Sequence, residues 1–208
     1  MEGKIKSDIG ELSPRKYFDK QSATWQSNIQ PGDSKRLYEI LSEKVEGIKR
    51  PVLDVGCGTG ILLPVLSKLK INVSPVYEVD LSFLMLMNNR ESHRKAIAAD
   101  HIQADVAYLP FTSDYFRTIL SFAAFAHFAL KNQVLEEFWR VLSPGGIFVI
   151  LHLMGCDNLN MMHARVGGAV KNDHLPPIDI LSSELENKNF RILHQEDLDN
   201  IYLLIARK

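Results

Sequence analysis

The sequence of 208 residues is poor in cysteine, in long apolar runs and in excess charge of either sign. Two cysteines are too few for a disulfide framework. No apolar run approaches the roughly 18 residues that a membrane-spanning helix needs. Lysine and arginine number 24 against 25 acids, with both signs interspersed, so the basic stripe of a nucleic-acid-binding protein is missing. These absences predict a protein with neither nucleic acid nor membrane among its partners.

The organisation of the chain is that of an ordinary globular protein with 46% hydrophobic residues. The first ten residues are charged and polar and lack the apolar core of a secretory signal. We expect a polar N-terminal segment, residues 1–33, that carries Tyr17, Phe18 and Trp25, followed by one domain, residues 34–208. We therefore predict a cytoplasmic protein that works as a monomer or a homodimer.

Apolar patterning along the domain predicts strands and helices in alternation. Short apolar runs predict strands at 52–55, 73–79, 102–104, 118–125, 147–153, 190–193 and 201–206. Periodic apolar positions predict helices at 34–48, 61–69, 82–94, 133–142 and 179–188, with Ser82 as a helix cap. The few residues between the last two strands allow a hairpin and no helical crossover, so these strands should be antiparallel. The pattern indicates an α/β protein.

The most informative stretch, residues 52–60, is an apolar run that ends in an acid and three alternating glycines. Glycines at a strand-to-helix junction let the backbone approach a ligand closely, at the edge where α/β sheets bind nucleotides. The spacing of Gly56, Gly58 and Gly60 is one residue shorter than the dinucleotide-binding fingerprint, which disfavours a nicotinamide dehydrogenase. Asp54 adds a negative charge that suits a cationic ligand better than a pyrophosphate.

This stretch resembles motif I of the class I S-adenosylmethionine-dependent methyltransferases, in particular the small-molecule members of type 11. Later segments resemble the family in the same order, at 79–82, 103–111, 119–128 and 142–146. The resemblance covers residues 34–153. It implies a Rossmann-like, doubly wound sheet of seven mostly parallel strands with an antiparallel C-terminal strand. It also implies S-adenosylmethionine as the cofactor and S-adenosylhomocysteine as the product.

The resemblance assigns cofactor-binding roles to several acids. Asp54 would balance the positive amine, and the carboxylate of Asp80 would accept the ribose hydroxyls. Glu78 points the same way along its strand and is an alternative ribose acid. Asp105 would accept from the adenine amine, with Asp100 as a competitor in the same loop. The full expected set is Tyr17, Trp25, Asp54, Gly56, Cys57, Gly58, Gly60, Asp80, Leu81, Ala104, Asp105, Val106 and Phe122.

Two regions are expected on the acceptor side. In the N-terminal segment, Tyr17 and Trp25 would line the site and attract a sulfonium through their aromatic faces, whereas Phe18 is equally well explained by packing. The second region is the connection 154–177, which is unusually long and would leave the ligand-binding edge of the sheet. We expect it to form a lid over a small acceptor.

Three histidines are candidate catalytic residues. His163 or His174 in the lid would be a general base, because a neutral imidazole is available near pH 7. His127 follows the fourth strand and would lie near the transferred methyl group. Hydrogen bonding within the lid is an alternative role for any single one of them. A metal held by Cys156, His163 and His174 is a further alternative, but their spacings match no zinc signature, so we expect no metal.

The combined pattern predicts methyl transfer from S-adenosylmethionine to a small-molecule nucleophile. Two alternatives stay open. One is an enzyme that keeps the fold and the cofactor but transfers an aminopropyl group or decarboxylates its substrate. The other is a non-catalytic protein that binds the cofactor or serves in an assembly. Fold alone does not choose among substrates, and the sequence names none.

Overall fold

The computed structural model of the chain describes residues 13–69, 75–93 and 97–208. The first twelve residues of the expected N-terminal segment, including the polar stretch 1–10, lie outside the described residues. The start of the strand predicted at 73–79 and the last residue of the helix predicted at 82–94 also lie outside them.

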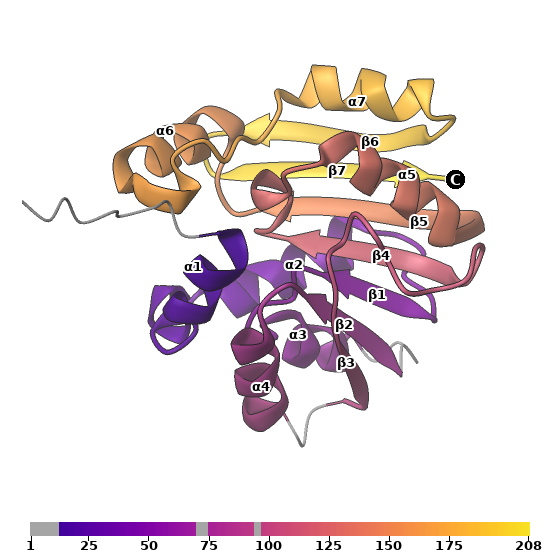
Figure 1. Ribbon diagram of the computed structural model, residues 1–208. Helices are drawn as coiled ribbons and strands as arrows, with labels where there is room; N and C mark the ends of the chain where they lie inside the picture. Colours follow the sequence, from indigo (N-terminus) through magenta and orange to yellow (C-terminus); the bar gives the residue numbers. More distant parts are fainter. Residues whose placement is uncertain (1–12, 70–74, 94–96) are drawn as a thin grey trace, which may run out of the picture.

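A seven-stranded sheet forms the centre of the protein (Figure 1). Its strand order is β3-β2-β1-β4-β5-β7-β6, and only β7 runs against its neighbours. The strands are β1 (Val52–Val55), β2 (Val76–Asp80), β3 (Ala99–Gln103), β4 (Phe116–Phe122), β5 (Leu142–His152), β6 (Arg191–Leu198) and β7 (Ile201–Arg207). The predicted α/β class and the antiparallel C-terminal strand are confirmed.

Helices cover both faces of the sheet because each carries one apolar stripe. On one face, α2 (Asp33–Lys44) and α3 (Leu62–Lys68) share a buried cluster with β1, β4, β5 and β7. On the other face, α5 (Lys131–Val141) and α7 (Ile178–Asn187) enclose a second cluster that includes Phe138 and Phe148. The helix α4 (Phe83–Ser92) contacts β2 and β3, and the side chain of Ser82 caps it as predicted.

Two helices lie at the edge where the parallel strands end (Figure 1). They are α1 (Pro14–Gln21), which is followed by the short 3₁₀ turn η1 (Trp25–Asn28), and α6 (Cys156–Val166). The turn η2 (Phe125–His127) follows β4, and η3 (Gly168–Val170) follows α6. The helix α1 contacts η3, so segments far apart in the sequence meet above the carboxyl ends of the strands.

Some elements differ from their predicted bounds. In the connection 154–177, the short helix that the sequence favours before Gly167 is present as α6, which starts two residues before Asn158 and is followed by η3. The strand β5 begins five residues earlier than predicted, at Leu142, because Leu142 pairs with Phe116 of β4 across a register shift. The strand β6 continues to Leu198 along its neighbour β7. Its side chains are largely exposed, which conceals such a strand from an apolar-run criterion.

Candidate functional site

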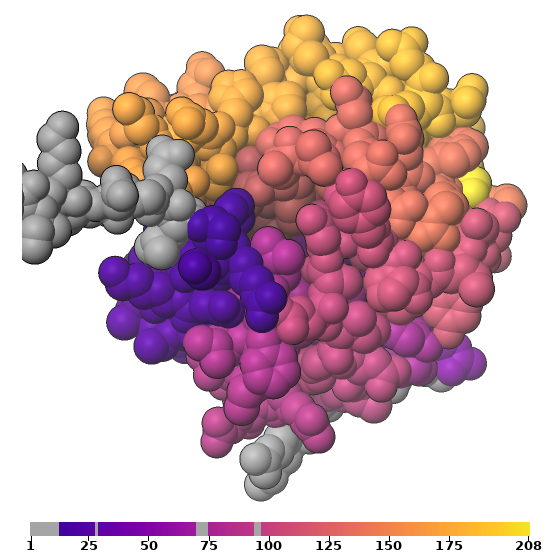
Figure 2. All heavy atoms as spheres, in the orientation of Figure 1, coloured from indigo at the N-terminus to yellow at the C-terminus, as the bar shows by residue number. Residues whose placement is uncertain are grey.

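A cavity of about 470 Å³ opens at the carboxyl ends of β1, β2 and β4. Figure 2 shows a hollow between the indigo N-terminal segment and the pink to salmon segments. The lining is mostly apolar and contains four carboxylates, one arginine and one histidine, namely Asp33, Asp54, Asp80, Asp105, Arg15 and His127. A mainly apolar cavity with a few converging polar groups is the usual form of a small-molecule site.

The glycine turn after β1 is held against the end of β2. The backbone amides of Gly56 and Cys57 donate to the carbonyl oxygen of Val79 at 2.8 and 3.1 Å. The amide of Gly58 donates to Oδ2 of Asp80 at 2.8 Å. Gly58 has a φ of +54°, a conformation that side chains with a Cβ rarely adopt. The turn therefore presents bare backbone to the cavity.

Gly60 has a packing role. A Cβ on Gly60 would lie 2.1 Å from Oδ1 of Asn89 on α4, so the position admits no side chain. Gly60 does not line the cavity, although we expected it to bind the cofactor. Because Gly60 has no side chain, the side chain of Asn89 fits against the glycine turn.

Asp80 is the acid at the end of β2 that faces the cavity. Its two carboxylate oxygens accept from the amides of Gly58 and Ser82, both at 2.8 Å. Burial raises the pKa of Asp80, while these hydrogen bonds oppose the rise. Each carboxylate oxygen has two lone pairs, so both oxygens keep acceptor capacity for a diol.

Asp54 is a buried carboxyl with an unsatisfied oxygen. Its side chain lines the cavity, its exposed fraction is 1%, and its Oδ2 has no hydrogen-bond partner among the described residues. Burial, followed by the charges of Glu78 and Asp80, raises the pKa of Asp54 well above its ordinary value. A buried polar atom without a partner is costly. A cationic or hydrogen-bond-donating ligand in the cavity would satisfy it.

Glu78 lies behind the cavity rather than in it. It is fully buried, and its Oε2 accepts from Nδ2 of Asn89 at 2.8 Å. Because Glu78 does not line the cavity, Asp80 is the β2 acid placed to meet a ligand. The thiol of Cys57 is also buried, and burial together with nearby acids raises its pKa well above the usual value. A thiol in that state is a poor nucleophile.

Aromatic side chains of the N-terminal segment close one side of the cavity. Phe18 and Trp25 line it, with ring centroids 5.9 Å apart in an edge-on arrangement. The indole of Trp25 lies beside the glycine turn, since its Nε1 is 3.5 Å from the position of a Cβ on Gly58. Tyr17 packs edge-on against Phe18 and is not part of the lining. Phe18 thus occupies the position that we expected for Tyr17.

The segment after β3 supplies the remaining expected residues. Ala104, Asp105 and Val106 line the cavity, as do Leu81 and Phe122. Oδ1 of Asp105 accepts from the amide of Ala107 at 2.9 Å, which fixes the turn. Asp100 lies in β3 outside the lining.

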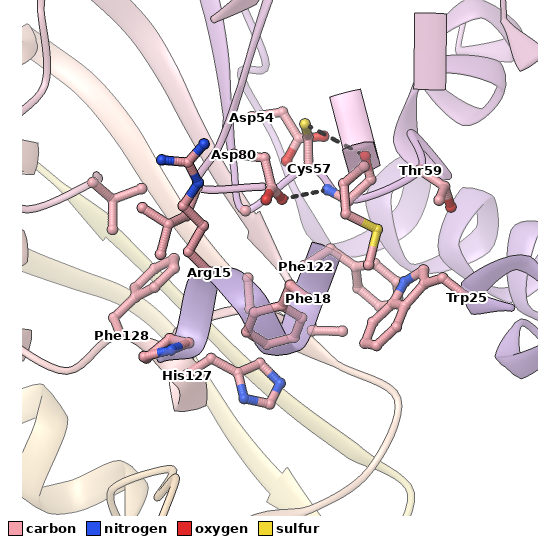
Figure 3. Close-up of a pocket in the computed structure, with 18 of the residues that line it drawn as sticks. Arg15, Phe18, Trp25, Asp54, Cys57, Thr59, Asp80, Phe122, His127 and Phe128 are labelled. Atoms are coloured by element: carbon pink, nitrogen blue, oxygen red, sulfur yellow. Dashed lines mark hydrogen bonds between the residues drawn. The ribbon is translucent and has the colours of Figure 1, made fainter. Parts of the chain in front are cut away.

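The three candidate histidines have different positions. His127 lines the cavity, and its Nδ1 donates to Oδ2 of Asp173 at 2.6 Å. His163 is buried in α6 outside the lining, and its Nδ1 donates to the carbonyl oxygen of Asp173 at 3.0 Å. His174 is exposed and also lies outside the lining. In Figure 3, His127 lies at the opposite side of the cavity from Asp54 and Asp80, with Phe18 between them in this view.

The alternative metal set does not form. The thiol of Cys156 donates to the carbonyl oxygen of Leu175 at 3.1 Å, and His163 is bound to Asp173. Across residues 13–69, 75–93 and 97–208, no three His, Cys, Asp or Glu side chains are grouped to hold a metal ion.

The cavity has residues that the sequence did not single out. They include Arg15, Ile29, Asp33, Thr59, Met85, Phe128, Leu130 and Val134, which come from α1, α2, α4, α5 and the connections between elements. Phe128 lies in a matched segment of the sequence, and Thr59 lies in the glycine stretch 52–60. The others carry no motif, because a helix contributes single side chains to a cavity without any recurring spacing.

The donor set fits S-adenosylmethionine. The unpartnered oxygen of Asp54 and the remaining lone pairs of Asp80 suit an ammonium group and a ribose diol. The bare backbone at Gly58 leaves space for a ligand close to the turn. Aromatic rings at Phe18 and Trp25 suit a sulfonium.

Comparison with known proteins agrees with this fit. Residues 53–150 match the family model described as "Methyltransferase domain". The uncharacterized methyltransferase YodH of Bacillus subtilis is 29% identical over 135 residues, which cover 64% of this chain and 56% of YodH. The ubiquinone/menaquinone biosynthesis C-methyltransferase UbiE of Pectobacterium carotovorum is 31% identical over 121 residues, covering 56% of this chain and 48% of UbiE. The chain thus spans about half the length of these curated relatives.

Solved structures share the fold. The crystal structure of a SAM-dependent methyltransferase from Aquifex aeolicus superposes with a TM-score of 0.68 at 20% sequence identity. The superposition covers 89% of this chain and 97% of that protein.

Proposed function

We propose that the protein transfers a methyl group from S-adenosylmethionine to a small-molecule nucleophile, since residues 53–150 match a family model of methyltransferase domains and the chain shares the fold of a solved S-adenosylmethionine-dependent methyltransferase. The observation that carries the proposal is the buried, unpartnered carboxylate oxygen of Asp54 in a cavity that Gly58 and Asp80 also line.

The chain's residues bind and orient the reactants. Asp54 neutralises the ligand's ammonium, Asp80 accepts the ribose hydroxyls, and Asp105 accepts from the adenine amine. Phe18 and Trp25 exclude water from the place where the methyl group moves. When bound, S-adenosylmethionine supplies an electrophilic methyl group on a sulfonium. Most of the rate enhancement then comes from positioning and desolvation.

The acceptor is proposed to be small. The whole cavity is about 470 Å³, and α1 and η3 meet beside it, so a folded macromolecule would not reach the buried acids. UbiE, one of the similar proteins, is named for C-methylation in ubiquinone and menaquinone biosynthesis. A reduced quinone or another phenol is therefore the first acceptor class to test.

Localisation and assembly complete the proposal. Among the described residues, none of the helices has the length and apolar character that crossing a bilayer requires. As a separate part of the proposal, we propose a cytoplasmic protein that is a monomer or homodimer without a resident metal. Light scattering of the purified protein and metal analysis test the last two points.

Calorimetry followed by a transfer assay tests the function. S-adenosylhomocysteine should bind with micromolar affinity, and Asp54→Asn should weaken it, whereas Asp157→Asn on the exposed start of α6 should not. Labelled methyl groups are then offered to a phenol, a hydroquinone, a thiol and an amine. Binding of NADH without binding of S-adenosylhomocysteine would contradict the cofactor assignment. Cofactor binding without transfer to any acceptor would favour a non-methylating or non-catalytic role.

A further inference from the structure

His127 and Asp173 form a hydrogen-bonded pair at the cavity, and no part of the cofactor-binding set requires it. His127 belongs to η2 after β4, and Asp173 belongs to the segment between η3 and α7. The distance from Nδ1 of His127 to Oδ2 of Asp173 is 2.6 Å. The two residues are 46 positions apart in the sequence, and His127 lines the cavity. The pair is therefore a candidate for a role in the reaction.

The backbone of Asp173 is held in place by a hydrogen bond from a second histidine, His163. Nδ1 of His163 donates to the backbone carbonyl of Asp173 at 3.0 Å, and the His163 side chain is buried. Burial, as the largest cause, lowers the pKa of His163, so this imidazole is neutral near pH 7. His163 therefore acts as a fixed hydrogen-bond donor that positions the Asp173 backbone. Its ring also lies 4.9 Å from the ring of His127.

The pairing defines the basic nitrogen of His127. A carboxylate only accepts hydrogen bonds, so Nδ1 of His127 carries the proton that is shared with Asp173. In the neutral ring, Nε2 is then the nitrogen that accepts a proton. Phe18, which lies edge-on to His127 with ring centroids 5.1 Å apart, restrains the ring in this position.

We propose that Nε2 of His127 is the general base that deprotonates the acceptor, and that Asp173 is the positioning residue that fixes its tautomer. The inference rests on the proposed function and assigns a base to it. The acceptor's O–H bond breaks, and its proton passes to Nε2. The acceptor forms a bond to the methyl carbon with an electron pair freed by that deprotonation. The carbon–sulfur bond breaks with its pair left on sulfur, and the imidazolium returns its proton to water.

The same geometry selects the class of acceptor. A phenolic hydroxyl has an ordinary pKa of about 10, not far above the roughly 6.5 of an imidazole. An aliphatic hydroxyl resembles water, whose pKa is about 15.7, and lies out of reach of such a base. The Asp173 carboxylate also stabilises the imidazolium that forms. Among hydroxyl acceptors the pair therefore favours a phenol or a hydroquinone, which the apolar and aromatic lining at Phe18 and Phe128 also suits.

The decisive variant is Asp173→Asn, which keeps the side-chain volume and removes the charge. Asp179→Asn at the exposed start of α7 is the matched control. Long-range ¹H–¹⁵N spectra of the neutral protein, assigned with His127→Asn, should show the proton of His127 on Nδ1 in the wild type. Asp173→Asn should move that proton, because the amide NH₂ is able to donate to Nδ1.

Transfer and binding assays complete the test. With hydroquinone and phenol as probes, Asp173→Asn should lower kcat by about 10²-fold. The acceptor KM and the S-adenosylhomocysteine Kd should stay within about threefold, and Asp179→Asn should match the wild type. A wild-type ring protonated on Nε2, or full turnover in Asp173→Asn, overturns the role of the pair. Transfer to neither probe overturns the acceptor class. Failure of the wild type to bind S-adenosylhomocysteine instead overturns the proposed function, while the tautomer result stands by itself.

Discussion

The backbone amide of Gly58 donates a hydrogen bond to Oδ2 of Asp80 at 2.8 Å, so the glycine turn after β1 and the acid at the end of β2 form one unit. Asp80 also accepts from the amide of Ser82 and so orients the start of α4. A change at Asp80 should therefore affect both ligand binding and stability.

Asp80→Ala should weaken S-adenosylhomocysteine binding by about 1–3 kcal/mol, because hydrogen bonds to a charged acceptor are lost. The half-buried amide of Gly58 and the buried amide of Ser82 lose their partner as well, so the free energy of unfolding should fall by a similar amount. Calorimetry and urea denaturation measure the two effects, with Asp100→Asn on the exposed edge of β3 as the control. Unchanged affinity in Asp80→Ala would remove Asp80 from the site.

Gly58→Val should abolish S-adenosylhomocysteine binding in a protein that still folds. The new side chain would occupy the space between the turn and Trp25, where a Cβ already lies 3.5 Å from the indole nitrogen. Gly58→Val should also lose some stability, because a side chain at positive φ strains the backbone. Gly145→Ala is the control for that strain, since Gly145 has a φ of +76° and no other atoms near the position of its Cβ. Calorimetry and circular dichroism decide the outcome, and a Gly58→Val protein that binds normally would show that the turn does not touch the ligand.

Trp25 should report ligand binding by its fluorescence. The protein has two tryptophans, of which Trp25 lines the cavity, whereas Trp139 packs edge-on against Phe190 at 4.9 Å, outside the lining. S-adenosylhomocysteine should therefore change the emission of the wild type and of Trp139→Phe, but not that of Trp25→Phe. A persistent signal in Trp25→Phe would place the ligand elsewhere.

The stability of the protein should depend on the ionisation of Glu78. Burial raises the pKa of Glu78 from 4.5 to about 7, against opposing hydrogen bonds from Asn89 and Cys57. Between these pH values the unfolded chain releases the proton first, so the contribution of Glu78 to stability falls as pH rises and stays low above pH 7. From pH 4.5 to 7.5, the free energy of unfolding of Glu78→Gln should rise relative to the wild type by on the order of 3 kcal/mol.

Urea denaturation across that pH range measures the effect of Glu78→Gln, and Glu186→Gln on the exposed side of α7 serves as the control. A constant difference between Glu78→Gln and the wild type would mean that the pKa of Glu78 is the same in the folded and the unfolded protein.

Much of the cofactor side follows from the sequence because it depends on local chain geometry. An apolar strand, an acid and spaced glycines specify a tight turn at a strand end, and that turn carries Asp54 and Gly58 wherever the fold places it. The acid at the end of the next strand follows by the same logic, because parallel strands end at one edge of the sheet. Gly60 shows the limit, since its contact with Asn89 of α4 is invisible in the spacing.

The side of the cavity that contains His127 was decided by tertiary structure. The chain contains seven histidines, and spacing alone favoured His163 and His174 as well as His127. Only the packing of α6 and η3 against the strand ends brings Asp173 to 2.6 Å from His127 and turns His163 inward as its support. The same packing places Phe18 rather than Tyr17 in the cavity. Sequence specifies which groups exist and which local turns they make, whereas long-range packing selects which of them meet, because burial and pairing are properties of the assembled core.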